Sequence, residues 1–186
     1  MTVLQTLWAP ILLSSVLVFF ASFVLHMLIP WHRDEMKKLP QEEQILDALR
    51  PFDIPPGDYI APHCSGPKEM ATPEFAERQR KGPIVFIHRY PHDPSRMGRS
   101  LMMWFAYILV ISFFAAYVAC HALRVGASYL HVFRFAGTTA FLGYTAALWQ
   151  MSIWYGRPWK TTLKVTVDGI IFAGLTAGTF GWLWPR

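Results

Sequence analysis

The chain has 186 residues, of which 53% are hydrophobic and only 16% are charged, and its formal net charge is +5. Soluble domains usually contain about 25% charged residues, so this composition excludes a single soluble globular domain and a disordered chain. The cations outside the central part of the chain lie beside apolar stretches and do not form a basic patch, so the net charge does not indicate nucleic-acid binding.

The first segment of the chain is apolar and long enough to cross a bilayer. Residues 1–32 contain no Lys, Arg, Asp or Glu. A cleaved signal peptide would have a basic start and a shorter apolar core, but the first cation is Arg33. We therefore predict that residues 1–30 form an uncleaved transmembrane span.

A charge-balanced segment follows at residues 31–99, with eleven acidic and eleven basic side chains. Proline and early acids predict a short helix over 39–50, and a threonine followed by proline predicts a second helix over 72–80. Residues 58–63 are expected to be extended, and the β-branched and aromatic residues of 84–90 predict a strand. We expect a small folded α+β cap.

Three further apolar segments lie at 100–123, 129–154 and 165–184. Each has the length of a transmembrane helix. Together with the first span they predict a membrane all-α fold, in which four transmembrane helices carry the cap between spans one and two.

The distribution of Lys and Arg predicts the orientation of these spans. Arg157, Lys160 and Lys164 lie in the short connection between spans three and four, on the same side as the cap. The other side has only Arg124 and Arg186. We therefore expect a multi-pass protein of the bacterial inner membrane, with both termini periplasmic and the cap cytoplasmic.

The cap contains side chains that commonly bind transition metals: His63, Cys64, His88 and His92. Pairing of the two extended stretches would bring them together, which makes them a candidate metal site. Their spacing matches no recognised metal motif, so ordinary surface or hydrogen-bonded roles remain the alternative.

Ionisable residues within the apolar segments are candidates for function, because their burial in lipid is costly. His26 and Asp168 are predicted at similar depths on spans one and four, so we expect a polar lock between them. Proton chemistry at the same pair is the alternative. His121 and His131 lie near the same end of spans two and three and are candidate axial ligands for haem.

Small residues at four-residue spacing predict close helix packing. Span three contains Gly143 and Ala147, and span four contains Gly174 and Gly178. We expect these faces to pack against another helix, within the chain or in a homo-oligomer.

Several segments carry a resemblance to known proteins: His26–His32, Pro56–Tyr59, Pro73–Phe75, Val132–Arg134 with Gly137 and Thr138, and Leu175–Arg186. The chain resembles small bacterial inner-membrane proteins with one span, a compact cap and three further spans. The resemblance implies this architecture and no activity.

Two functions are therefore expected from the sequence. The first is a non-catalytic membrane scaffold or accessory subunit of a larger inner-membrane assembly, embedded in lipid, with the cap contacting a cytoplasmic partner. The alternative is a redox membrane protein that carries a transition metal or haem on the cap residues or on the intramembrane histidines. The motifs of common soluble enzymes are missing from the sequence, so an enzyme is the less expected class.

Overall fold

The computed structural model describes residues 3–186, and the chain forms two compact units. The first unit contains the chain up to Lys37 together with Ser95–Arg186, and the second contains Lys38–Pro94. The expected first span, residues 1–30, begins outside the described residues.

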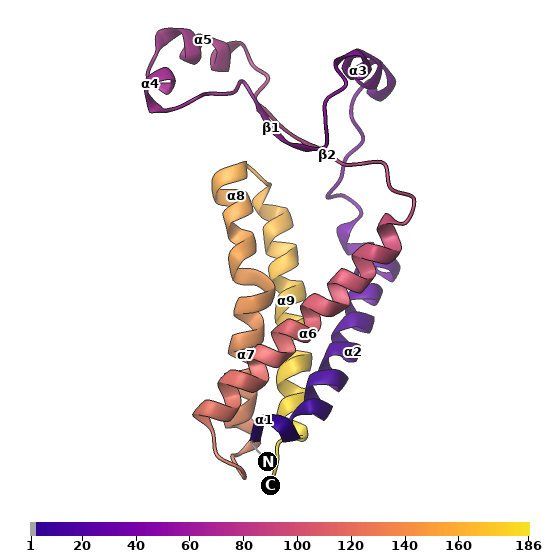
Figure 1. Ribbon diagram of the computed structural model, residues 1–186, viewed down its shortest axis with the longest axis vertical. Coiled ribbons are helices and arrows are strands. Elements are labelled where there is room, and N and C mark those ends of the chain that lie inside the picture. Colours follow the sequence, from indigo (N-terminus) through magenta and orange to yellow (C-terminus); the bar gives the residue numbers. More distant parts are fainter. Residues whose placement is uncertain (1–2) are drawn as a thin grey trace. The chain divides into compact units, whose positions relative to one another are not determined.

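Three helices of the first unit are long and apolar enough to cross a membrane (Figure 1). The first is α2 (Trp8–Phe23), which continues into the π-helical turn η1 (Val24–Leu28) and is preceded by the short helix α1 (Val3–Thr6). The second is α6 (Arg96–Ala122), and the third is α9 (Trp159–Trp182). The protein is thus mostly helical, with three helices that suit a membrane.

The segment expected to be the third span does not form one continuous helix. It consists of α7 (Tyr129–Thr145), the 3-10 turn η4 (Ala146–Leu148) and α8 (Trp149–Tyr155). The backbone leaves the helical region at Thr145, where φ is −129° and ψ is −37°. Among the described residues, neither α7 nor α8 is one of the helices long and apolar enough to cross a membrane by itself.

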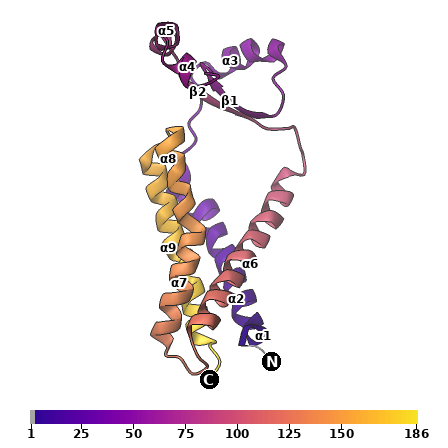
Figure 2. The same ribbon diagram turned by 60° about the vertical axis from the view of Figure 1, so that its left-hand side comes forward.

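The helices of the first unit enclose two apolar clusters. One cluster joins Leu7 and Trp184, near the two ends of the described chain, to small residues of α6 and α7. The other joins Val18 and Phe172 to residues of α6 and α7. In Figure 2, α7 runs beside α9 along its length, and α2 and α6 cross next to them. The helices are held by apolar packing over most of their length.

Glycines bring α7 and α9 into close contact. A methyl group added at Gly137 would lie 2.9 Å from the Cβ of Ala177, and one added at Gly181 would lie 2.7 Å from the ring of Tyr129. Gly169 lies directly against Thr145, the residue at which α7 ends. The close contact of α9 with Thr145 therefore lies at the point where the helix is interrupted between α7 and α8.

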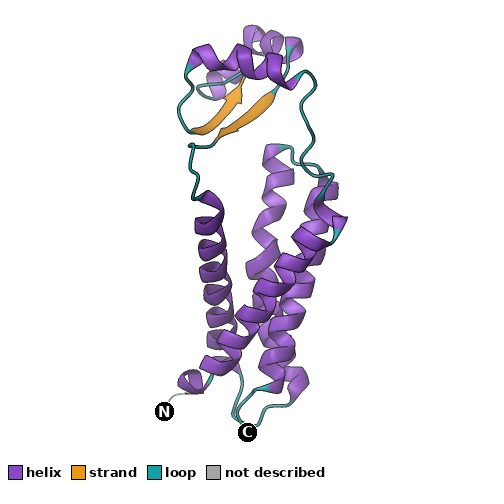
Figure 3. Ribbon diagram, turned by 90° about the vertical axis from the view of Figure 1, so that its right-hand side faces the viewer, coloured by secondary structure: helices purple, strands orange, loops and turns teal. Residues whose placement is uncertain are grey.

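The second unit is a small α+β fold (Figure 3). Strands β1 (Gly57–Ala61) and β2 (Val85–Arg89) pair in antiparallel register, with Tyr59 opposite Ile87. The unit also contains α3 (Glu42–Leu49), the 3-10 turn η3 (Arg50–Phe52), α4 (Pro67–Met70) and α5 (Pro73–Lys81). Thr72 caps α5 by accepting a hydrogen bond from the Phe75 N–H. The predicted two-stranded sheet and its helices are confirmed.

Candidate functional site

The end of the first membrane-length helix has an unusual backbone that brings two histidines together. In η1 the Ile29 N–H donates to the Val24 carbonyl, 3.0 Å away. The chain then enters a 3-10 turn, η2 (Pro30–His32). As a result the rings of His26 and His32 are stacked, with centroids 4.3 Å apart and an interplanar angle of 3°. Such π-helical turns occur frequently at functional sites.

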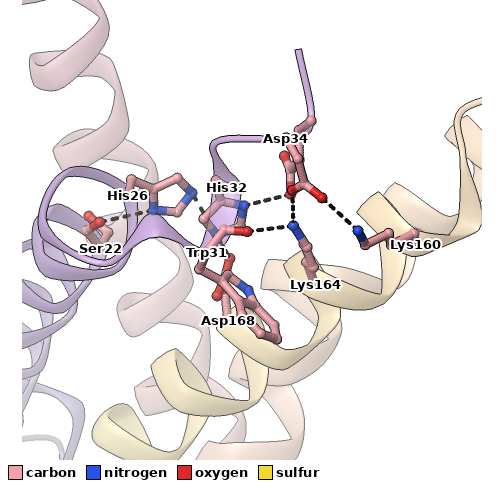
Figure 4. Close-up of polar contacts among 9 residues, drawn as sticks. Ser22, His26, Trp31, His32, Asp34, Lys160, Lys164 and Asp168 are labelled. Atoms are coloured by element: carbon pink, nitrogen blue, oxygen red, sulfur yellow. Dashed lines mark hydrogen bonds and ion pairs between the residues drawn. The ribbon is translucent and has the colours of Figure 1, made fainter. Parts of the chain in front are cut away.

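Asp168 of α9 faces this pair of imidazole rings (Figure 4). Its Oδ2 lies 2.8 Å from Nε2 of His32 and 4.0 Å from Nε2 of His26. The Asp168 side chain is 3% exposed and that of His32 is 10% exposed. The His32–Asp168 contact has the length of an ion pair between a protonated imidazole and a carboxylate, but its alignment falls short of a hydrogen bond. Two imidazole rings thus converge on one buried carboxylate, and all three side chains are of types that bind metals.

The other nitrogen of each imidazole is held by a hydrogen-bond acceptor. Nδ1 of His26 lies 2.9 Å from the Ser22 carbonyl, and Nδ1 of His32 lies 2.6 Å from Oε1 of Glu35. A carbonyl and a carboxylate only accept hydrogen bonds, so we assign the proton of each neutral ring to Nδ1. The lone pairs of both Nε2 atoms are then left facing Asp168.

Two lysines of α9 hold the chain that follows His32. Nζ of Lys160 donates to Oδ2 of Asp34 at 2.6 Å. Nζ of Lys164 donates to Oδ1 of Asp34 and to the Trp31 carbonyl, and it lies 5.5 Å from the centroid of the Trp31 ring. Hydrogen bonds from Lys160 and Lys164 hold the pKa of Asp34 well below its ordinary value. These contacts fix η2, and with it His32, against α9.

The cluster of His26, His32 and Asp168 adjoins a half-open cavity of the first unit. The cavity has a volume of about 690 Å³ and is lined by residues of α2, η1, α6, α7, η4 and α9. His26 and Asp168 are part of its lining. A group bound at the cluster would therefore be reachable from the cavity.

The cap residues expected to bind metal do not gather in this way. Among residues 3–186, the group of His, Cys, Asp and Glu side chains whose ligand atoms converge is His26, His32 and Asp168. His88 instead pairs with Asp58 on the neighbouring strand, and Cys64 donates to the Gly66 carbonyl at 3.1 Å. His63 and His92 belong to no such group within the described chain.

The two histidines considered for haem are both exposed. Nδ1 of His121 lies 2.8 Å from the Tyr117 carbonyl of its own helix, and it also lies 3.3 Å from Sγ of Cys120. His131 lies in the first turn of α7.

The residues expected to mediate helix packing differ in their surroundings. A methyl group added at Gly143 would lie 3.1 Å from Ile111 of α6, and one at Gly178 would lie 3.6 Å from the Tyr129 hydroxyl. Gly174 has no such neighbour within 4 Å, and Ala147 is exposed in η4. The close α7–α9 contacts are made by other glycines.

The sequence around His32 contains a signal for the part of this site that lies outside the expected spans. His32 and Glu35 lie just beyond the apolar segment, outside the expected first span. His26 and His32 lie on either side of Pro30 at the end of the apolar segment, and an acid, Glu35, follows three residues after His32. This pattern indicates a site whose geometry is set by the backbone at the end of the helix. Comparison of the chain with protein-family models, with curated proteins and with solved structures finds no match, so the residues of this site are the basis for assigning a function.

Proposed function

We propose that this chain is an integral membrane protein that binds one divalent transition-metal ion through Nε2 of His26, Nε2 of His32 and the carboxylate of Asp168. The observation that carries this proposal is the convergence of these three groups, in which the buried carboxylate has no aligned hydrogen-bond donor. Leaving such a carboxylate uncompensated inside a helix bundle is costly. A bound cation would compensate it.

The distances support a shared ion. Two ligand atoms that each lie about 2.1 Å from one ion are about 3.0–3.4 Å apart, and each lies off the other's lone-pair axis. The His32–Asp168 contact, at 2.8 Å and off axis, is close to this arrangement. His26 would have to move about 0.6 Å toward Asp168 from its present 4.0 Å to reach the same range. Its 45% exposed side chain has room for this movement.

The surroundings of the ligands also suit a metal. Histidines that bind metals usually donate their second N–H to a carbonyl or a carboxylate, which orients the ring. Ser22 and Glu35 supply these two acceptors. Two imidazoles and one carboxylate are a donor set of Zn²⁺ and Fe²⁺ sites that keep open coordination positions. Here such positions would face the cavity.

Metal content of the purified protein tests this proposal. The protein would be purified in mild detergent with an affinity tag free of histidine, and the ions counted by mass spectrometry. We expect about one ion per chain. Asp168→Asn and His32→Gln should each weaken Co²⁺ binding at least tenfold, since each removes a ligand. The control His131→Gln removes an exposed histidine of the same unit and should bind normally.

A purely structural lock would give a different result. If His26 and Asp168 only join two helices, the wild-type protein should contain no stoichiometric metal, and Co²⁺ should produce no visible ligand-field bands. Equal Co²⁺ affinity of the wild type and Asp168→Asn would also contradict the proposal. Circular dichroism of each variant would check that the helices are retained.

We also propose that the chain crosses the membrane four times. Three crossings are the helices described above, and α7, η4 and α8 together form the fourth. The start of α2 and the end of α9 lie at the same end of the bundle (Figure 1), as an even number of crossings requires. The Lys and Arg distribution favours the cap on the cytoplasmic side of a bacterial inner membrane. Reporter fusions at residue 60 and at the C-terminus should report opposite sides of the membrane.

A scaffold or accessory-subunit role is the second candidate. It is favoured by a groove of about 370 Å³ on α7 and α9, which is lined in part by Gly137 and Gly174. Small residues let another helix approach closely. Gly174→Leu should then reduce the size of the complex in mild detergent, whereas an unchanged size would contradict self-association through this face.

A further inference from the structure

The cavity beside His26, His32 and Asp168 has walls that are almost entirely apolar. Its lining includes Phe19, Phe23, Leu101, Trp104 and Phe172. Along α9 it extends from Val165 to Phe172, which corresponds to about 10 Å of helix axis. Its volume of about 690 Å³ is within the range of about 300–1,000 Å³ typical of pockets that hold one small molecule. The cavity is suited to a single apolar chain.

The polar side chains in the cavity lining are Ser22, His26, Tyr107, Tyr144 and Asp168. Ser22 already donates to the Phe19 carbonyl at 2.7 Å and accepts from the Trp104 indole N–H at 2.9 Å. Tyr107 donates its hydroxyl to the Gly143 carbonyl at 2.5 Å. His26, Asp168 and the Tyr144 hydroxyl, which has no partner among the described residues, therefore remain available to an occupant. A molecule that fills the cavity would place its polar head against the cluster and its chain among the aromatic side chains.

Charge around the cluster determines which head group fits. The ionised side chains that contact the cluster, or hold the segment next to it, are three carboxylates and two ammonium groups: Asp34, Glu35, Asp168, Lys160 and Lys164. Leaving the two imidazoles out of the count, these five groups carry one net negative charge without a metal, which would repel an anion. A divalent ion converts this to one net positive charge, which an anionic oxygen ligand would neutralise.

We propose that the cavity holds the chain of a fatty acid, whose carboxylate occupies an open coordination position of the ion bound by His26, His32 and Asp168. This inference rests on the metal binding proposed above. Lipid chains are as apolar as the cavity walls, so moving a chain from the bilayer into the cavity gains little free energy. Selection therefore depends on the head group, and the carboxylate provides it through the metal.

Quenching of Trp104 fluorescence by a brominated fatty acid tests this proposal, together with the visible spectrum of Co²⁺ bound to the protein in nanodiscs. We expect bromostearate to shift the Co²⁺ bands and to quench the fluorescence, with most of the quenching lost in Trp104→Phe. Removal of Co²⁺ should weaken binding at least tenfold. The methyl ester of bromostearate should bind at least tenfold more weakly than the acid, because it lacks the anionic oxygens.

A pair of variants on one helix tests whether the chain lies in the cavity. Val165→Phe places a larger side chain in the lining and should weaken binding at least tenfold. Val167→Phe is the control, since Val167 is 43% exposed and does not line the cavity. Equal effects of the two variants would overturn the proposal.

The outcomes separate this inference from the function on which it rests. Co²⁺ bands that appear but do not respond to bromostearate would overturn the fatty-acid proposal alone. Equal binding of the acid and its methyl ester would do the same. Failure of Co²⁺ to bind at all would overturn both proposals.

Discussion

The contact between α7 and α9 at Gly137 predicts a measurable cost for one added methyl group. The Cβ of an alanine at this position would lie 2.9 Å from the Cβ of Ala177, which is itself fixed to the backbone of α9. Ordinary carbon contacts are about 3.5–4.0 Å, so the helices would have to separate by about 0.6–1.1 Å. Overpacking of this kind typically costs about 1–3 kcal/mol.

Gly174→Ala provides a matched control for Gly137→Ala. Both glycines lie within long helices, so the helix propensity gained by alanine, about 1 kcal/mol, applies to both. A side chain at Gly174 meets no atom within 4 Å. Within one chain, the difference between the two variants in free energy of unfolding therefore reports the steric overlap at Gly137, and we expect Gly137→Ala to be less stable by about 1–3 kcal/mol.

Unfolding in mixed micelles with increasing sodium dodecyl sulfate, followed by circular dichroism, provides the comparison. Both variants should keep the wild-type helix content before the transition. If the two variants unfold within about 0.5 kcal/mol of each other, α7 and α9 do not pack through Gly137 and the reasoning is refuted.

Two further predictions concern carboxylates outside the membrane-length helices. Because the pKa of Asp34 is lowered from 3.8, its ion pairs should persist above about pH 4 and weaken only in more acidic solution. Asp34→Asn should therefore lower the midpoint of thermal unfolding by a constant amount between pH 5 and pH 8, and a difference that shrinks within that range would contradict this. Hydrogen bonds from the Ser65 N–H and Arg78 lower the pKa of Glu69. Glu69→Gln should accelerate hydrogen exchange at the Ser65 amide near neutral pH, and an unchanged rate would count against this hydrogen bond.

Much of the architecture follows from local patterns in the sequence. Apolar length predicted α2, α6 and α9, and β-branched residues between prolines predicted β2. The division of residues 129–154 has no comparable signal. Thr145 donates to the Phe141 carbonyl at 2.8 Å and lies against Gly169 of another helix. The interruption thus depends on a contact that forms only when the bundle assembles.

The candidate site shows the same division between local and tertiary information. Counting residues from the ends of the spans placed His26 and Asp168 at similar depths, and Nε2 of His26 lies 4.0 Å from Oδ2 of Asp168. The same counting left His32 outside the membrane segment. Its position beside Asp168 depends on the π-helical turn and on the lysines of α9, neither of which hydropathy reveals.

The π-helical turn also restricts which changes in chain length the site can accept. One residue advances an α-helix by about 100° around its axis. Deleting a single residue from η1 would let the α-helical hydrogen bonds, from N–H to the carbonyl four residues earlier, continue to Ile29. The deletion would also rotate His32 by about 100° around the helix axis relative to His26. A substitution at Met27 leaves the angle between His26 and His32 around the helix axis unchanged, whereas a deletion at Met27 changes it. We therefore expect descendants of this chain to vary in the residues between the two histidines while keeping their number.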